Sequence, residues 1–429
     1  MTVEQWLGSH RVGGFQIFVT VLCGLAVFLD GISTQLIAYL APAIHNALHL
    51  DHKQMGAAFA AGMVGLLVGG LACSVLADIF GRRRVLIVST LIFGIFTLVT
   101  GTATSGTELL LWRLIAGLGL GGAMPIAITL TAEIAPSHAR SVMVMAMFCG
   151  FPLGSAIAGL LASAIMPSYG WSAVFYAAGA ISLVVAAVLI VALPESLVFL
   201  VDRDAGPSRI AAVRRRIDPA SGELRFDKNE TNKMPVVGLF REGRSTGTLI
   251  MWVIYFCSLL EIYFLASWLP TVLNQGGRSV ANAALGTSML QFGGVAGTLV
   301  FGQFMDRLNP HRILLIGYVA AGVFIAMIGH LYRSDIILPI LFLAGMCLIG
   351  CQSGLSAVAS VFYPTSARAT GIGWNLSVGR LGSVTGPVIG AVLLTSNVGV
   401  ESMFMWIALP TLLAGVLALA LKYVTPKSS

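Results

Sequence analysis

Twelve apolar segments, each long enough to cross a lipid bilayer, constrain this chain more than any other feature of its sequence. A helix needs about 20 residues to span the hydrocarbon core. The segments lie at residues 15–41, 54–77, 84–103, 108–132, 142–165, 171–193, 248–273, 281–304, 311–331, 335–361, 371–395 and 402–423. Only 10% of the residues are charged, whereas soluble domains contain about 25%. The sequence therefore predicts an all-α membrane protein with 12 transmembrane helices.

The distribution of positive charge predicts the orientation of the chain, because positively charged loops are retained in the cytoplasm. With a cytoplasmic N-terminus, Lys53, Arg278 and Arg333 lie outside, Arg113 and Arg380 lie within helices, and every other Lys and Arg is cytoplasmic. Both termini are therefore expected in the cytoplasm. The stretch before the first span lacks a signal-peptide pattern, so this span is expected to be retained. The same clustering explains the basic pI near 9.3 without nucleic-acid binding.

The two halves of the chain are related by an internal repeat. One long polar segment, residues 202–247, contains ten Lys and Arg and separates six spans from six. A single fixed offset in the numbering carries Pro42 onto Pro270, Asp78 onto Asp306, Pro136 onto Pro364, Arg140 onto Arg368, and Gly154-Ser155 onto Gly382-Ser383. The sequence predicts an N-terminal bundle at 1–201, a cytoplasmic linker at 202–247 and a C-terminal bundle at 248–429. Internal repeats of this kind are typical of secondary transporters.

Several short motifs carry a family resemblance. The loop after the second span reads "ADIFGRRR", and its counterpart in the second half reads "GQFMDRLNPHR". Further stretches are "FLDG", "AEIAPSHAR", "FYPTSARATGIG" and "GRLGSVTGP". Together they resemble the major facilitator superfamily and, within it, the aromatic acid:proton symporters. The resemblance implies two pseudo-symmetric six-helix halves that transport by alternating access.

The loop motifs imply a cytoplasmic gate. Acidic and basic side chains recur in them at corresponding places of the two halves, and such pairs would hold the cytoplasmic side shut in the outward-open state. The alternative is that the arginines only follow the rule for positively charged loops. The expected gate residues are Asp78, Gly81, Arg82, Arg83, Glu133, Arg140, Asp306, Arg307 and Arg368.

Four ionisable residues lie deep within predicted spans: Asp30, Arg113, Glu261 and Arg380. A charge at a helix centre costs about 2.5–3.5 kcal/mol on insertion scales, so such residues are rare and usually functional. Arg380 is the first candidate for binding the carboxylate of a substrate, because a guanidinium can hold a carboxylate through two hydrogen bonds. Arg113 is either a second anchor or a partner of Asp30. The alternative for all four is a set of structural ion pairs.

Asp30 is expected to be the proton-coupling carboxylate. Burial disfavours the charged form of a carboxylate and a nearby cation favours it, so the two effects together can set proton uptake near neutral pH. The family's first helix usually carries a second acidic residue three positions later, where this chain has Ser33. The repeat partner of Ser33 is Glu261. The hypothesis is that Glu261 replaces the missing carboxylate from the other half.

An aromatic substrate needs stacking surfaces and hydrogen-bond partners for its ring substituents. Residues of these types occur in spans that flank the central cavity of the superfamily, although packing or a membrane-interface position is the alternative for each. The expected substrate-binding residues besides the arginines and Ser33 are Gln35, Tyr255, Tyr263, Gln291, Phe292, Trp374 and Asn375. Tyr39 and Trp268 are further aromatic candidates.

Two motifs that suggest a cofactor or a metal have simpler explanations. "GLGLGG", from Gly117 to Gly122, fits a dinucleotide fingerprint, but that fingerprint needs a preceding strand, whereas close packing of membrane helices explains the glycines. His45, His49 and His52 have a spacing that zinc could use, but they fall in a predicted outer loop. No cofactor and no metal are expected, and protons are the predicted coupling ion.

The sequence thus predicts a transporter, not an enzyme: a bacterial inner-membrane symporter that takes up a small aromatic carboxylate, such as a hydroxybenzoate or a phenylpropanoate, with protons. It is expected to act as a monomer in the lipid bilayer. One alternative is a proton-driven exporter of a metabolite or drug on the same fold. Another is a chemoreceptor for aromatic acids, for which the only hint is the basic stretch "AAVRRRI" in the linker.

Overall fold

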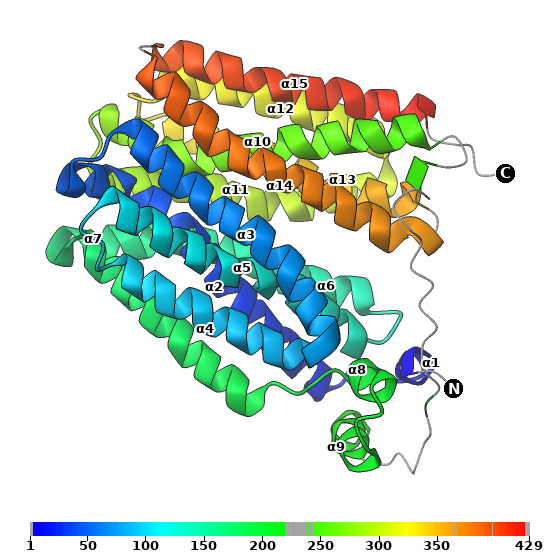
Figure 1. Cartoon of the computed structure of the whole chain (residues 1–429). Helices are drawn as coiled ribbons and strands as arrows, with labels where there is room; N and C mark the ends of the chain where they lie inside the picture. Colours follow the sequence, from blue (N-terminus) through cyan, green and yellow to red (C-terminus); the bar gives the residue numbers. More distant parts are fainter. Residues whose placement is uncertain are drawn as a thin grey trace.

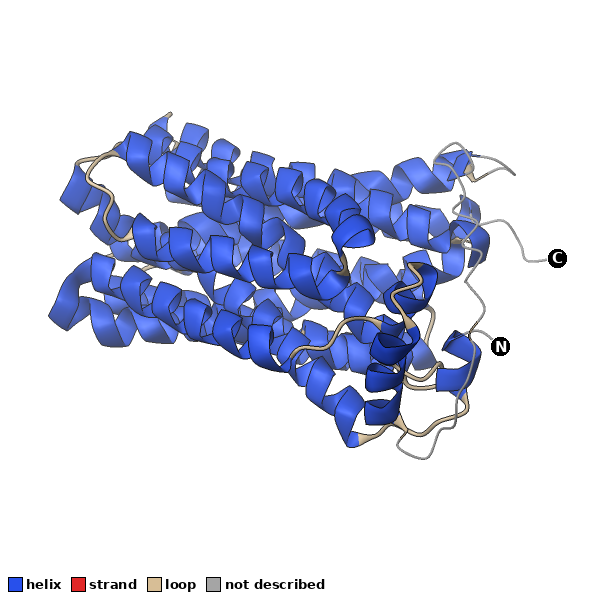
Figure 2. Cartoon of the chain, turned by 60° about the horizontal axis from the view of Figure 1, so that its bottom comes forward, coloured by secondary structure: helices blue, strands red, loops and turns tan. Residues whose placement is uncertain are grey.

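The computed structural model describes residues 3–218, 226, 239–240, 244–363, 365–396 and 398–424. Within these ranges the side chains of residues 4, 141, 306, 307, 360 and 365–369 are not described. The described residues form helices and loops, without strands (Figure 2). The helices are α1 (Val3–Gly8), α2 (Gly14–Leu48), α3 (His52–Phe80), α4 (Arg82–Thr100), α5 (Gly106–Ile134), α6 (Arg140–Phe148), α7 (Gly150–Ala192), α8 (Leu197–Asp202), α9 (Pro207–Ile217), α10 (Ser245–Gln275), α11 (Val280–Arg307), α12 (Pro310–Leu331), α13 (Ile337–Phe362), α14 (Thr365–Thr395) and α15 (Val400–Val424).

The predicted count of 12 spans is confirmed once α7 is divided at its kink. Eleven helical segments are long and apolar enough to cross a membrane, and one of them covers Val142–Ala192, 51 residues. Gly170 interrupts it with φ of 78°, a conformation that a side chain disfavours. Before the kink, Gly154 packs on the Phe28 carbonyl of α2; after it, Gly179 packs on Leu98 of α4. The two arms of α7 therefore contact different helices and count as separate spans.

Close glycine contacts repeat in the two halves at the offset found in the sequence. Gly65 of α3 lies against the Leu114 carbonyl of α5, and its repeat partner Gly293 of α11 lies against the Phe342 carbonyl of α13. Three further contacts of the N-terminal half recur in the C-terminal half in the same way. The contact Gly69–Leu118 recurs as Gly297–Met346, Gly117–Gly62 recurs as Gly345–Leu290, and Gly154–Phe28 recurs as Gly382–Phe256. The halves are thus duplicated in their helix packing as well as in their motifs.

The packing explanation for "GLGLGG" is confirmed. A Cβ on Gly117 would overlap the Gly62 carbonyl of α3, and one on Gly121 would overlap the Leu66 carbonyl. Both glycines are therefore needed for α3 and α5 to approach each other closely, as small residues spaced by four allow in membranes.

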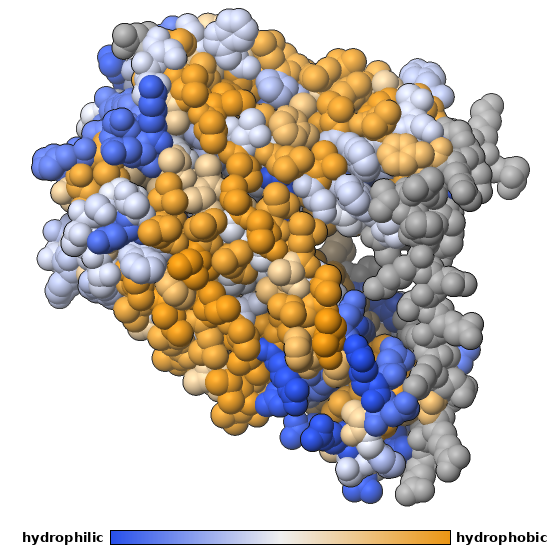
Figure 3. Space-filling view, viewed as in Figure 1, coloured by the Kyte–Doolittle hydropathy of each residue, from blue (hydrophilic) through white to orange (hydrophobic). Residues whose placement is uncertain are grey.

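The two bundles meet mainly through α3 with α14, α7 with α11, and α2 with α10 and α11. α1 and the last turn of α15 lie on one side, called here the terminal side (Figure 1). The side of the loop between α2 and α3 is called the distal side. Figure 1 shows the bundles close together at the distal side, on the left, and further apart towards the terminal side. Figure 3 shows a hollow between them at the terminal side.

A tryptophan closes the distal side. Trp268 of α10 is 1% exposed; its ring lies edge-on to Phe59 of α3, 5.3 Å away. Its Nε1 donates to the Pro387 carbonyl of α14 at 2.9 Å. A Cβ on Gly56 of α3 would overlap Ala391 of α14. Because Trp268 joins the two bundles here, the interior is closed distally and opens towards the terminal side.

The outer surface is apolar over most of its length. Large hydrophobic side chains are exposed along the helices, among them Val68 (49%), Val184 (64%) and Val416 (60%). On the face that Figure 3 shows, orange hydrophobic residues with some pale ones among them cover most of the middle, and blue hydrophilic residues gather towards the ends. An apolar surface of this extent requires a lipid environment.

Candidate functional site

Asp30 is buried in the interior of α2. Asp30 is only 2% exposed. Its Oδ1 accepts a hydrogen bond of 3.0 Å from the hydroxyl of Thr34, one helical turn later. Residues four apart share one face of a helix, so Thr34 is placed to orient this carboxylate. One hydrogen bond leaves the carboxylate largely uncompensated at a depth where charge is costly.

Arg380 of α14 provides the cationic group that acts on Asp30. The two charges interact electrostatically, and Tyr263 of α10 interacts with both. The guanidinium lies directly against Gly70 of α3, where any side chain would overlap it. Asp30 and Arg380 do not form a direct ion pair within 4.0 Å. Arg380 therefore reaches from the C-terminal bundle across to the N-terminal one, without its charge being neutralised by contact.

These three residues, Asp30, Tyr263 and Arg380, form the interbundle site. Asp30 comes from α2 in one bundle, and Tyr263 and Arg380 come from α10 and α14 in the other, so a change in the relative position of the bundles changes the distance of Asp30 from the other two. A carboxylate, a phenol and a guanidinium together can hold a proton and an organic anion. The structure thus brings together one predicted proton-coupling residue and two predicted substrate residues.

Arg113 occupies a different position, inside the N-terminal bundle. It is 1% exposed, and its Nη2 donates to the backbone carbonyl of Ser33 at 3.0 Å. Its Nε and Nη1 are buried without a hydrogen-bond partner, as is the Ser33 hydroxyl. Gly62 of α3 lies beside the guanidinium, where a Cβ would be in ordinary contact with Arg113 Nε and Nη2, 3.8 Å away. Arg113 thus places a buried positive charge on the α2 backbone, within one turn of Asp30.

Glu261 lies away from the interbundle site. It is fully buried, and its Oε2 accepts a hydrogen bond from Thr411 of α15, while Oε1 has no partner. Tyr318 of α12, which donates to Ser258 at 3.2 Å, is also close enough to interact with it. The carboxylate at the repeat position of Ser33 therefore faces the inside of its own bundle.

Three other predicted substrate residues are engaged within the C-terminal bundle. The Tyr255 hydroxyl donates to Ser356 at 3.1 Å. Asn375 accepts from the Tyr363 hydroxyl at 3.2 Å. Trp374 is 41% exposed and stacks on Trp252, with centroids 5.8 Å apart.

The side chains of Gln35 and Gln291 make no hydrogen bond to another described residue. Gln35 and Gln291 are buried, at 4% and 3% exposure, and Phe292 is half-buried. Tyr39 donates to the Ser155 carbonyl at 2.9 Å within the N-terminal bundle. Trp268 belongs to the distal closure and lies away from the interbundle site.

The terminal-side motif forms a charge network within one bundle. Arg82 pairs with Asp78 and with Glu133, each at 3.1 Å. Gly81 has φ of 102°, and a Cβ there would overlap the Glu195 carboxylate, which accepts from the Arg83 backbone N–H at 3.0 Å. The motif thus connects α3, α4, α5 and the segment after α7.

Arg140 begins α6; the side chains of Asp306, Arg307 and Arg368 lie outside the described residues.

The family follows from comparison with known proteins. The family model described as Major Facilitator Superfamily matches residues 23–331 and 251–429. The chain belongs to this superfamily. Its relatives include the 4-hydroxybenzoate transporter PcaK of Pseudomonas aeruginosa, 37% identical with 96% of this chain and 94% of the relative covered. The gallate transporter of Pseudomonas putida is 37% identical, with 97% and 94% covered.

A third relative and two solved structures agree with this assignment. The 3-(3-hydroxy-phenyl)propionate transporter of Escherichia coli is 35% identical, with 92% of this chain and 91% of the relative covered. A bacterial homologue of the human lysosomal transporter Spinster, inward-facing, has the same fold. Its unoccupied form gives a TM-score of 0.71 at 17% identity and its occupied form 0.75 at 16%, each covering at least 96% of this chain and 98% of the other. The relatives of 35% to 37% identity are transporters, and this chain is a transporter of the same superfamily and not an enzyme.

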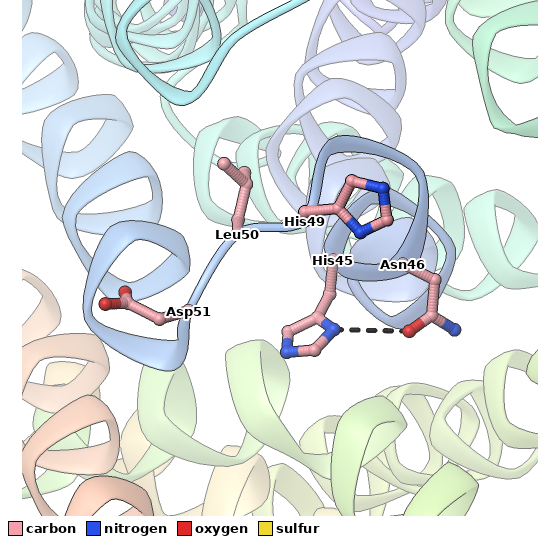
Figure 4. Close-up of a pocket in the computed structure, with 5 residues that line it drawn as sticks. All are labelled: His45, Asn46, His49, Leu50 and Asp51. Atoms are coloured by element: carbon pink, nitrogen blue, oxygen red, sulfur yellow. Dashed lines mark hydrogen bonds between the residues drawn. The ribbon is translucent and has the colours of Figure 1, made fainter.

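The three histidines do not share one helical face. α2 ends at Leu48, and His49 caps it with φ of 51°, while His52 begins α3. They surround the distal loop, where a cavity of about 540 Å³ is lined by His45, His49 and Asp51 (Figure 4). Among the described residues no group of three or more His, Cys, Asp or Glu could hold a metal ion.

Two residues that contact the interbundle site, Thr34 and Gly70, were not predicted from the sequence. Thr34 could have been found, because it lies four residues after Asp30 on the same helical face. Gly70 carries no such signal: among 49 glycines only the tertiary structure shows which one faces Arg380.

Proposed function

We propose that the protein takes up a small aromatic carboxylate together with protons by alternating access. The observation that carries the proposal is the interbundle site, where a buried carboxylate and a guanidinium from opposite bundles interact electrostatically without forming an ion pair. The relatives named for 4-hydroxybenzoate, gallate and 3-(3-hydroxy-phenyl)propionate support an aromatic acid as the substrate. Such a molecule offers a carboxylate for Arg380 and a ring for Tyr263.

In the proposed mechanism the two charges of the site act in turn. Arg380 binds the substrate carboxylate through its planar guanidinium. Asp30 takes up the coupled proton, and its protonation removes a negative charge that would repel the substrate anion. Arg113 influences Asp30 through the α2 backbone rather than by contact with the substrate. Gln35, Gln291 and Phe292 are proposed to contact the ring or its hydroxyl groups.

The described conformation is proposed to be the inward-facing one. Both termini, the arginines of residues 82–84 and the linker are placed in the cytoplasm by the positive-inside rule, and the hollow between the bundles opens to that side. The protein is proposed to act as a monomer in a bacterial inner membrane. Rocking the bundles about the site would separate Trp268 from Phe59 of α3 and open the distal side.

Uptake into proteoliposomes tests the proposal. Labelled 4-hydroxybenzoate should accumulate above equilibration when an inward proton gradient is imposed, and unlabelled aromatic acids should compete. Export driven by the gradient would favour the exporter, and binding without movement would favour a receptor. Failure of every aromatic acid to bind or move, with folded protein, would remove the substrate from the proposal.

Asp78→Asn is expected to slow transport and leave substrate binding unchanged. The substitution removes a partner of Arg82 at 3.1 Å, while the Arg82–Glu133 pair remains. Asp78 is 52% exposed in this pair, and exposed ion pairs contribute about 1 kcal/mol or less to stability. Initial uptake rates and equilibrium binding, measured on the same preparation, check the prediction. Equal loss of both would contradict a gating role.

Glu261→Gln decides whether the carboxylate in the C-terminal bundle participates in proton coupling. Glutamine keeps an oxygen that can accept from Thr411, so the packing of α10 on α15 is expected to survive. If Glu261 supplies a second coupled proton, the variant will carry fewer protons per substrate, measured as the ratio of proton to substrate flux. An unchanged ratio would assign Glu261 to structure alone. Thr411→Val is the matched control for the hydrogen bond.

A further inference from the structure

A second cavity, separate from the interbundle site, lies at the terminal side where α3 ends and α4 begins. It has a volume of about 560 Å³, and its walls come from these two helix ends and from α8 and α9. Four arginines line it: Arg83, Arg84, Arg203 and Arg209. Glu195 is the only carboxylate among its lining residues, all of which belong to the described part of the chain.

The single carboxylate does not neutralise these arginines. Glu195 Oε1 accepts the backbone N–H groups of Arg83 and Ser196, each at 3.0 Å. The Arg83 guanidinium donates instead to the Ile190 carbonyl at 2.6 Å, and Arg203 donates to the Asp78 carbonyl at 2.8 Å. Carbonyl contacts fix the position of a guanidinium and leave its charge in place. The cavity is therefore strongly positive.

Two of the arginines are directed to solvent without an acidic partner. Arg84 and Arg209 are exposed, and neither has an ion pair with a carboxylate of the described residues. They come from α4 and α9, so they approach the cavity from different walls. A ligand that bridges them must carry negative charge and several acceptor atoms.

The apolar neighbours of the cavity place it at the membrane boundary. Ile79 and Phe80 line it and are 50% and 53% exposed. They continue the exposed apolar flank of α3, which includes Val75 at 60%. In Figure 3 this orange flank ends at blue residues around α8 and α9. Positive charge next to exposed apolar side chains is suited to a molecule with an anionic head and a hydrocarbon tail.

The wall formed by α9 is fixed on the protein. Its apolar residues Ile210, Val213 and Ile217 pack against a small cluster of α1 and α8 that includes Trp6 and Leu197. Because this apolar face is covered by protein, the helix does not insert it into the bilayer. α9 holds Arg209 in a defined position above the α3–α4 end.

We infer that this cavity binds the phosphate-bearing headgroup of an anionic phospholipid of the surrounding membrane. Arg84 and Arg209 bind the phosphate oxygens, since guanidinium groups bind phosphate through paired hydrogen bonds. Ile79 and Phe80 contact the first part of the acyl chains. The bound lipid joins α9 to the first turn of α4, beside the charge network of Asp78, and thereby stabilises the terminal side of the N-terminal bundle.

Native mass spectrometry of the full-length, delipidated protein tests this inference with phosphatidylglycerol as the probe and phosphatidylcholine as the neutral comparison. The double variant Arg84→Gln/Arg209→Gln should weaken phosphatidylglycerol binding about 25-fold, from the contribution of each cation near an anionic lipid. The matched control is Arg215→Gln/Arg216→Gln, which removes the same charge from α9 at positions that do not line the cavity. The control should retain the affinity of the wild type.

Three outcomes would overturn the inference: equal weakening in both double variants, equal affinity for the two lipids, or displacement of phosphatidylglycerol by millimolar inorganic phosphate. Far-ultraviolet circular dichroism establishes that each variant is folded. The single variant Arg209→Gln changes only an exposed position of α9 and leaves α4 as it is in the wild type. Its affinity for phosphatidylglycerol should fall about fivefold.

Discussion

Asp30→Asn is expected to abolish accumulation of an aromatic acid driven by a proton gradient. Asparagine has nearly the same shape and can still meet Thr34, but it cannot take up and release a proton. The substrate should still equilibrate across the membrane, because Arg380 and Tyr263 remain. The measurement is uptake of labelled 4-hydroxybenzoate with and without an inward proton gradient. The variant should reach the same level under both conditions, while the wild type exceeds equilibration only with the gradient.

Two comparisons make this result specific to the proton. Exchange of internal for external substrate needs no net proton movement, so its survival in Asp30→Asn would separate coupling from folding and binding. Thr34→Val removes the hydrogen bond to Oδ1 and retains the titratable group. It should shift the pH dependence of uptake and leave accumulation in place. Accumulation that persists in Asp30→Asn would transfer the coupling role to another group, of which Glu261 is the first candidate.

Arg380→Gln is expected to raise the KM for an aromatic carboxylate about 100-fold, because truncating one partner of a buried charge pair costs about 2–5 kcal/mol. Arg380→Lys keeps the charge and loses the planar guanidinium, so an intermediate effect is expected. Binding measured at equilibrium, together with uptake rates, distinguishes a loss of affinity from a loss of turnover. Unchanged affinity in Arg380→Gln would exclude this arginine as the carboxylate anchor.

The environment of Arg380 offers a second route to the same test. Gly70→Ala places a methyl group where the guanidinium lies, so the arginine must move while its charge is retained. The affinity should fall in the same direction as in Arg380→Gln, by a smaller factor. Gly14→Ala is the matched control, because a Cβ at that position meets no atom within 4 Å. An equal effect of the two alanines would indicate general destabilisation rather than displacement of Arg380.

The predicted deep charges show how far sequence reasoning extends into the site. All four proved to be in the interior: Asp30, Arg113 and Glu261 are at most 2% exposed, and Arg380 is half-buried. Their roles differ, however. Arg380 reaches the other bundle, Arg113 binds a backbone carbonyl of its own bundle, and Glu261 binds Thr411. Hydropathy gives the depth of a residue in the membrane and says little about the direction in which its side chain points.

Glu261 illustrates this difference most clearly. The repeat offset correctly relates Gly65 to Gly293 and Phe28 to Phe256 in their packing. It also relates Ser33 to Glu261, but the carboxylate faces α15 within the C-terminal bundle. A longer side chain at an equivalent backbone position finds its partner among whichever helices surround it. The internal repeat therefore predicts which backbone contacts recur in the second half, but it does not predict the partner of an individual side chain.

The sequence by itself determined the number of spans, the repeat and the residues buried in the membrane. These depend on the length and composition of each segment, because a bilayer requires about 20 apolar residues whose backbone hydrogen bonds are satisfied within the helix. The tertiary structure decided which buried groups meet. That depends on the rotation of neighbouring helices and on how closely they approach. Backbone contacts at glycines such as Gly65 and Gly117, where a Cβ would overlap the next helix, set this approach. Asp30, Tyr263 and Arg380 form one site because three helices, remote in sequence, are held at that spacing.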